Sequence, residues 1–361
     1  MLKRLLAFAF LLASLVNARA QQCGNNIGLY TQKNVDDFAA RNLSIITGSL
    51  IIQAGFGGDI TNLNGLSSVR SVCGDLIIAK NTGLTSLEGL SNITSVGGNL
   101  ILDYNSQLTS LSGLNNLGTV GKSLTLLHND GLRSVNGLGS LASIGENLGT
   151  DNSNVNLPNL DGLTSLTEIG GSISIQGANF VNLQGLNRIK SIGGGLFIDA
   201  VRSFSGLDSL ATIDGELSIR NVLIDNLTPI SNIKGIKSIT IQGNNLSICH
   251  VTSICNFLNA SNGGTITINS NRSGCNSQQE VLTRCNTVTA ISNKPRAIDQ
   301  SIYPNPANNF ITRSSSAPYI IYDKLGRNLL QGSGNKINIA SLANGLYYLS
   351  TANKVTKFVK E

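Results

Sequence analysis

The sequence predicts an all-β protein. We expect a single-stranded parallel β-helix, or solenoid, of about 9–10 coils with short helical caps that carry disulfides, followed by a small antiparallel β-sandwich. Three observations lead to this prediction. A pattern of apolar residues recurs every 21–26 residues through the middle of the chain, six cysteines gather at the two ends of that region, and short apolar runs alternate with Gly, Asn and Pro after residue 300.

Residues 1–20 are predicted to be a secretory signal peptide. Lys3 and Arg4 precede an apolar run from Leu5 to Val16, and Ala18-Arg19-Ala20 supplies a small-residue cleavage site. The apolar run would cover only about 18 Å as a helix, whereas a bilayer core is about 30 Å thick. No later stretch is long and apolar enough to span a bilayer, so we expect an exported chain without a transmembrane segment.

The repeats favour stacked coils of short strands. A period of 21–26 residues is shorter than that of paired-helix repeats, and no repeat carries a helical stripe. Each coil leaves its apolar residues uncovered, so stacking at about 4.8 Å per coil would supply both the core and the hydrogen bonds. The first strand of each coil has two inward residues around an outward one: Leu50/Ile52, Leu76/Ile78, Leu100/Leu102, Leu124/Leu126, Leu148/Thr150, Ile173/Ile175, Leu196/Ile198, Leu217/Ile219 and Ile239/Ile241.

Two further columns are predicted to build the corners of the coils. One column consists of glycines, which permit a positive φ or a close approach of backbones: Gly65, Gly89, Gly113, Gly137, Gly162, Gly185 and Gly206. The other consists of Asn81, Asn105 and Asn129, spaced 24 residues apart, which we expect to stack as a ladder of side-chain amides. These residues are interpreted as architecture rather than as a binding site.

The ends of the solenoid need covers. Residues 35–43 have helical spacing and would cover the first coil, while residues 254–258 and 279–282 would cover the last. An even number of cysteines in an exported protein indicates disulfides, and Cys23 pairs with Cys73 by position. The remaining four cysteines allow three pairings, of which we favour Cys249–Cys275 and Cys255–Cys285. They lack a CxxC spacing and no cluster of histidines accompanies them, so we expect no metal there.

Repeats of the form GxLxIxxNxxLTSLxGLxNIxSVGG between cysteine-bearing ends resemble the receptor L-domain family. The resemblance covers about residues 23–285, within a solenoid that we assign to residues 21–285. That family forms the ligand-binding β-helices of insulin- and EGF-type receptors and occurs in fungal wall and bacterial surface proteins. The sequence shows no cysteine-rich module, transmembrane helix or kinase, so the resemblance implies a fold and no receptor signalling.

The tail, residues 301–361, follows a polar stretch at 286–300 that is predicted to be a linker. Its short strands and turns indicate a small antiparallel sandwich. The motifs YPNP, IYDxxGR and LxxGLYYL and the Lys-rich end resemble the type A C-terminal sorting domain of the Bacteroidota type IX secretion system; the residues that carry the match are Tyr303, Pro304, Asn305, Pro306, Gly326, Gly345 and Tyr347. The resemblance implies the type IX machinery as a partner, removal of the tail, and export through the periplasm to the cell surface or extracellular space.

The distribution of charge argues against nucleic acid as a partner. The formal net charge of +6 divides into +3 for residues 1–20, −2 for residues 21–295 and +5 for residues 296–361. The basic pI therefore comes from the two ends, and the large middle segment is slightly acidic. It has no run of Lys or Arg that could follow a phosphate backbone.

A candidate ligand site lies on the outward face of the first strand, because side chains alternate along a strand. Ile51, Ile77 and Ile101 would form an exposed apolar stripe, a feature that often marks an interaction surface. Beside it, Asp103 and Tyr104 adjoin Leu127 and His128 of the next coil. A carboxylate, an aromatic ring and an imidazole together suit a glycan or a protein ligand.

The sequence favours a binding protein without enzymatic activity, cofactor or metal. Asp103, Asp151 and Asp199 are two coils apart, about 10 Å, which lies at the outer limit for a catalytic carboxylate pair. No Ser or Cys has a recognisable base, and His128 and His250 are the only histidines. The alternatives are a polysaccharide-degrading β-helix enzyme, which requires a tight carboxylate pair in a groove, and a structural surface-layer component, which would self-associate.

Overall fold

The computed structural model describes residues 23–55, 60–177, 179–260, 263–293, 302–313, 316–323, 327–351 and 354–361. The chain divides into two compact units with the boundary between Val288 and Thr289. The first unit is a stack of coils with two parallel sheets, and the second consists of antiparallel strands. The expectation of an all-β, solenoid-like protein followed by an antiparallel domain is therefore confirmed at this level.

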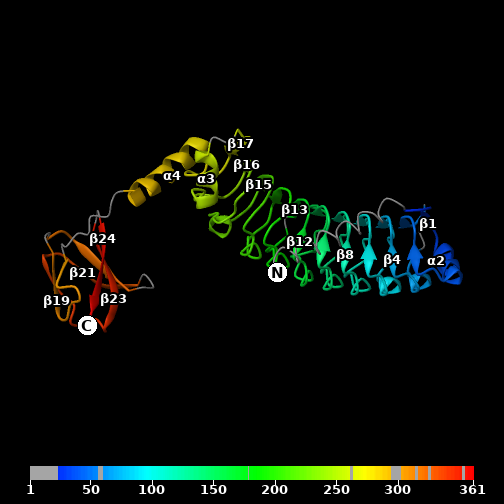
Figure 1. The fold of residues 1–361 in the computed structure, drawn as a ribbon, viewed down its shortest axis with the longest axis horizontal. Helices are drawn as coiled ribbons and strands as arrows, with labels where there is room; N and C mark the ends of the chain where they lie inside the picture. Colours follow the sequence, from blue (N-terminus) through cyan, green and yellow to red (C-terminus); the bar gives the residue numbers. More distant parts are fainter. Residues whose placement is uncertain are drawn as a thin grey trace, which may run out of the picture. The chain divides into compact units, whose positions relative to one another are not determined.

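The longer parallel sheet, here called sheet A, takes one strand from each coil (Figure 1). Its order follows the sequence: β1 (Ile27–Leu29), β3 (Leu50–Gln53), β5 (Leu76–Ala79), β7 (Leu100–Asp103), β9 (Leu124–Leu127), β11 (Leu148–Thr150), β13 (Ile173–Gln176), β14 (Leu196–Asp199), β15 (Glu216–Arg220), β16 (Ser238–Gln242) and β17 (Ile266–Asn269). The pairs Leu50↔Leu76 and Leu76↔Leu100 reproduce the register expected from the repeats. Their side chains are fully buried, so the leading residue of each repeat builds the core.

The shorter parallel sheet, sheet B, lies along another side of the same coils. It contains β2 (Ile45–Ile46), β4 (Ser71–Val72), β6 (Ser95–Val96), β8 (Thr119–Val120), β10 (Ser143–Ile144) and β12 (Glu168–Ile169). Isolated parallel bridges continue this pairing at Ile192, Thr212 and Lys234. Each strand has only two residues and contributes one buried side chain, such as Val72 or Val96, to the core.

Short 3₁₀ turns close several coils, and the first two of them contain glycines of the predicted column. They are η2 (Asn64–Leu66), η3 (Glu88–Leu90) and η4 (Thr228–Ile230). Gly89 of η3 has an ordinary φ, but a Cβ at this position would overlap the Leu63 carbonyl of the preceding coil. Gly113, one coil later, combines the same close approach with a φ of +106°. Both predicted reasons for glycine therefore apply at Gly113, whereas only the close approach of backbones applies at Gly89.

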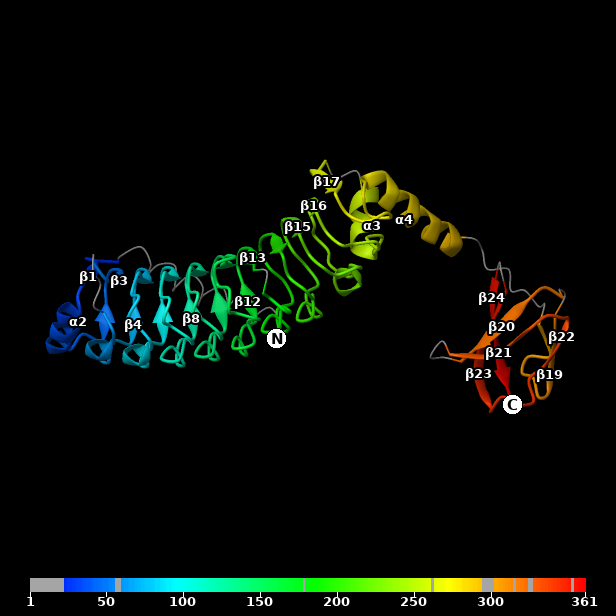
Figure 2. The ribbon, with the colours of Figure 1, turned by 180° about the vertical axis from the view of Figure 1, so that it is seen from behind.

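Helices cover both ends of the stack, as the two views in Figures 1 and 2 show. Helix α2 (Gln32–Phe38) and the 3₁₀ turn η1 (Ala39–Arg41) bury Val35 and Phe38 against the first coils. Helix α3 (Thr252–Asn259) buries Ile254 and Phe257 at the other end. Helix α4 (Gln278–Asn293) follows, so residues 286–293 are helical where the sequence was read as a linker.

Three disulfides fasten these ends. Cys23 is joined to Cys73, Cys249 to Cys275 and Cys255 to Cys285. These are the pairings favoured from the sequence, and the structure contains no free cysteine among the residues that it describes. The last bond connects α3 to α4 and so fixes the longer cap helix to the shorter one.

The second unit has two antiparallel sheets around one core. The first contains β18 (Ile302–Tyr303), β19 (Phe310–Arg313) and β22 (Lys336–Asn338). The second contains β21 (Asn328–Gly332), β20 (Tyr319–Tyr322), β23 (Gly345–Thr351) and β24 (Lys354–Lys360). Ile311 from the first sheet and Phe358 from the second belong to the same buried cluster.

Candidate functional site

The candidate residues lie where strands of sheet A end. After β5, β7 and β9 the chain turns through a single left-handed residue: Lys80, Tyr104 or His128, with φ of 58°, 55° and 50°. This conformation costs of order 1 kcal/mol for a residue other than Gly or Asn. Three consecutive coils nevertheless use it, and Tyr104 and His128 therefore project at equivalent points of neighbouring coils.

A ladder of buried asparagines stabilises these turns. Asn105 donates from Nδ2 to the Ile78 carbonyl (2.9 Å) and to Oδ1 of Asn129 (3.1 Å), while its Oδ1 accepts from the backbone N–H of Asn81 (3.3 Å). The backbone N–H of Asn129 donates in turn to Oδ1 of Asn154 (3.2 Å). The predicted amide ladder is therefore confirmed, and it extends one coil further than the sequence spacing indicated.

The rings of Tyr104 and His128 stack on each other. Their centroids are 4.0 Å apart and their planes differ by 4°. Because the two residues belong to adjacent coils, the stacking direction follows the direction from coil to coil. The rings therefore present their edges to solvent, and His128 occupies one face of the Tyr104 ring.

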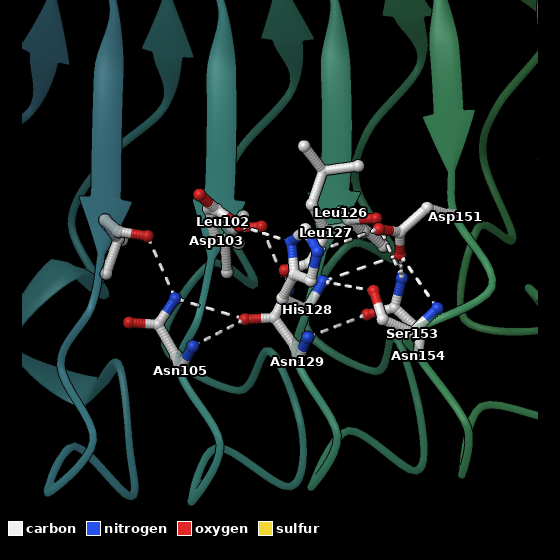
Figure 3. A network of polar contacts seen from close by, with 11 residues as sticks. Leu102, Asp103, Asn105, Leu126, Leu127, His128, Asn129, Asp151, Ser153 and Asn154 are labelled. Carbon is white, nitrogen blue, oxygen red and sulfur yellow. Dashed lines mark hydrogen bonds and ion pairs between the residues drawn. The ribbon is translucent and has the colours of Figure 1, made fainter.

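The imidazole of His128 lies between two carboxylates (Figure 3). Its Nδ1 is 3.0 Å from Oδ1 of Asp103, and its Nε2 is 3.8 Å from Oδ2 of Asp151. The side chains are 39% exposed for His128, 24% for Asp103 and 26% for Asp151. Solvent thus reaches the whole cluster, which screens its ionic interactions.

Asp151 completes the cluster, although the sequence did not identify it as a ligand-binding residue. Its Oδ1 accepts hydrogen bonds from the backbone N–H of Ser153 (3.2 Å) and from Nδ2 of Asn154 (3.0 Å). The backbone N–H of His128 donates to the Ser153 hydroxyl (2.9 Å). The signal available in the sequence was that Asp103, Leu127 and Asp151 occupy the same position in three successive coils.

The predicted stripe of Ile51, Ile77 and Ile101 forms a continuous row in sheet A. Its side chains are half-buried, so the stripe is only partly exposed. Adjacent coils place these side chains against one another. At the first strand, the ring of Tyr30 folds over Gly28, the neighbour of Ile51 in the sheet. Leu127, next to His128, is half-buried as well.

A separate concavity lies apart from this cluster. It has a volume of about 310 Å³ and is lined by residues that include Glu280 and Arg284 of α4. There, backbone N–H groups of Asn276 and Gly274 donate to Glu280 and lower the pKa of its carboxyl. Burial, with Arg284 nearby, lowers the pKa of His250.

Within the part of the chain that the structure describes, no three His, Cys, Asp or Glu side chains are grouped to hold a metal.

The residues that carry the tail motifs have largely structural contacts. Oδ1 of Asn305 accepts from the Val359 N–H (2.9 Å), so the YPNP segment holds the last strand. Tyr347 is buried, its hydroxyl donates to the Ala343 carbonyl (2.7 Å), and its ring lies 5.7 Å from that of Phe358. The flanking motif residues Tyr303, Pro304 and Pro306 are exposed, and Gly345 begins β23. Gly326 lies outside the described residues, as does the predicted signal peptide.

Comparison with known proteins identifies the second unit. Residues 301–361 match the family model of the secretion system C-terminal sorting domain, which belongs to the type IX system. The chain matches no curated protein. None of the helices that the structure describes is long and apolar enough to cross a membrane. The chain therefore carries a C-terminal sorting domain that directs its export to the cell surface or the extracellular space.

Proposed function

We propose that this protein is a non-enzymatic binding protein that holds a glycan or a protein ligand on the outward face of sheet A. The observation that supports the proposal best is the cluster of Asp103, Tyr104, His128 and Asp151, which is ordered by hydrogen bonds and ring stacking and yet open to solvent. Export of the chain to the surface brings this face into contact with extracellular ligands. The resemblance of the repeats to receptor L-domains, whose solenoids bind ligands, agrees with the proposal.

The geometry of the cluster favours recognition by hydrogen bonding. The stacked rings offer their edges, and the carboxylates of Asp103 and Asp151 offer acceptor oxygens on both sides of His128. Such a surface matches ligand hydroxyl, amide or ammonium groups, which donate to carboxylates. The half-buried row of Ile51, Ile77 and Ile101 adds an apolar contact area beside it.

The test is ligand binding by the full chain and by variants that keep the turns intact. Asn adopts the left-handed conformation readily, so Tyr104→Asn removes the ring without straining the turn. We expect Tyr104→Asn and Asp103→Asn to weaken binding at least about tenfold, as loss of a central contact does. Asp199→Asn changes the same strand position on β14 and should leave binding unchanged. Binding is measured on a glycan array and against a panel of surface proteins. Both assays contain a metal chelator.

A polysaccharide-degrading enzyme is the second candidate, because the carboxylates of Asp103 and Asp151 flank one imidazole. Measurable hydrolysis of a polysaccharide panel that disappears in Asp151→Asn would replace the binding proposal with this one. If Tyr104→Asn and Asp103→Asn both keep the ligand affinity of the wild type, the binding surface does not include this cluster.

A further inference from the structure

The gap between His128 and Asp151 has a composition that suits a positively charged partner. An ionised carboxylate only accepts hydrogen bonds, so in a neutral imidazole the 3.0 Å contact with Asp103 favours the tautomer that carries its N–H on Nδ1. The lone pair of Nε2 then faces Oδ2 of Asp151 at 3.8 Å. Two acceptors that face each other at this distance repel unless a cation or a donor lies between them.

The two facing atoms are held in place from behind. Oδ1 of Asp151 is engaged by Ser153 and Asn154, which leaves Oδ2 directed at the imidazole. The imidazole is oriented by Asp103 at one edge and by the Tyr104 ring on one face. A carboxylate that accepts from the far nitrogen of a histidine is the arrangement that orients metal-binding histidines in proteins.

We propose that Nε2 of His128 and Oδ2 of Asp151 bind one divalent transition metal ion of the zinc and copper class. Imidazole nitrogen together with carboxylate oxygen suits these ions. Bonds of about 2.1 Å span about 3.4 Å at the tetrahedral angle. The two atoms therefore need to approach by only about 0.4 Å, which their partly exposed side chains can accommodate.

The site has two protein ligands, and water fills its remaining coordination positions. Asp103 acts as a positioning residue, because its hydrogen bond keeps the proton on Nδ1 and the lone pair on Nε2. The charges of the two carboxylates compensate those of the ion. An open coordination sphere of this kind leaves room for an oxygen of an external ligand. The inference goes beyond the proposed function, since the ion can bind whether or not a glycan or protein ligand exists.

Zinc titration of the full chain, with any affinity tag removed, tests this site. Calorimetry should show one Zn²⁺ ion per chain. His128→Asn, which fits the left-handed turn, should abolish binding, and Asp151→Asn should weaken it at least about tenfold. Asp103→Asn should weaken it about 10–100-fold, as loss of an orienting carboxylate does. Asp199→Asn is the matched control and should bind zinc as the wild type does.

A second measurement distinguishes binding of a metal ion at His128 from protonation of its imidazole ring. With Cu²⁺ as the probe, electron paramagnetic resonance should show one coordinated nitrogen, and this signal should vanish in His128→Asn. The proposal is overturned if zinc and copper do not bind, or if binding survives in His128→Asn. It is also overturned if NMR finds the His128 ring doubly protonated and unaffected by zinc at neutral pH. All of these measurements are made without glycan or protein ligand, so their failure leaves the binding proposal to its own test.

Discussion

Single asparagines carry much of the order around the candidate site. Asn81, Asn105 and Asn129 are fully buried, and each bonds to the backbone of a coil other than its own. A buried amide pays for its desolvation only when both its oxygen and its nitrogen are bonded. The ladder satisfies both by linking one coil to the next, which keeps the left-handed residues before each Asn in place.

Asn105→Ala tests the ladder. The change removes bonds to the Ile78 carbonyl, to Asn129 and to the N–H of Asn81, and leaves buried polar groups without partners. We expect a loss of about 3 kcal/mol, or roughly 6–12 °C in the thermal midpoint, measured by circular dichroism.

Asn116→Ala is the matched control for this change. Asn116 also bonds to the preceding coil, through Nδ2 to the Ser91 carbonyl (2.8 Å), but it is exposed to solvent. Water can replace the lost partner there, so the cost should stay within about 1 kcal/mol. If the two variants lose the same amount of stability, burial of the amide is not what makes the ladder stabilising.

At the scale of elements, the coils tolerate changes in the length of their turns without losing register. Asn105 follows the leading residue of β7, Leu100, by five positions, whereas Asn154 follows the leading residue of β11, Leu148, by six. Asn154 therefore takes the place in the ladder that the repeat assigns to position 153. The pairing Leu124↔Leu148 nevertheless continues the column of the earlier strands. The extra residue is absorbed at the corner, outside the sheet.

The variable length of the corners also explains which parts of the structure could be predicted from the sequence. Alternating apolar residues fix which side chains of sheet A point inward, so the core and register were predictable. They do not fix what covers an outward side chain, and Ile77 is therefore less exposed than expected. Asp151 was missed because its role depends on the corner that holds Ser153 and Asn154. Residues 286–293 lack an apolar stripe, which hid the continuation of α4 beyond Cys285.

Helix α4 provides a pH-dependent element. The carboxylate of Glu280 accepts from the N–H groups of Asn276 (2.9 Å) and Gly274 (2.7 Å), which lowers its pKa from an ordinary 4.5. A lowered pKa in the folded state means that the stabilisation is present above the ordinary value and is lost as the pH falls through the folded value. Glu280→Gln should therefore lower the thermal midpoint at neutral pH.

The difference between Glu280→Gln and the wild type should shrink at acid pH. Thermal unfolding followed between about pH 3 and pH 7 measures it. Gln279→Ala alters an exposed, uncharged neighbour on the same turn and should shift the midpoint equally at every pH. A Glu280→Gln effect that stays constant down to the lowest pH would contradict the assignment of these hydrogen bonds.

At the scale of the whole molecule, the chain consists of two compact units with separate cores. The first unit holds the stacked coils and the His128 cluster, and the second is the sorting domain. The large core of the first unit contains no residue of the second, and the second has its own buried cluster. The division into two cores agrees with a domain that serves export and a cargo that serves the exported state.

Deletion of residues 301–361 should separate these tasks. We expect the truncated chain to accumulate in the periplasm of a type IX-competent host, measured by fractionation and surface labelling. The reciprocal control is a reporter that carries the predicted signal peptide, residues 1–20, and residues 301–361, and it should reach the outside. Normal surface display of the truncated chain would show that sorting information lies elsewhere.

The disulfides at the two ends of the stack have a mechanical consequence. A chain pulled at its ends, or trimmed there by a protease, would lose its coils one at a time, because each coil bonds only to its neighbours. Cys23–Cys73 joins the first described residue to the turn after β4, and Cys255–Cys285 joins the two helices at the far end. While these bonds remain oxidised, the segments that they join cannot separate completely. We therefore expect the oxidised protein to resist shear and stepwise proteolysis better than the reduced chain does.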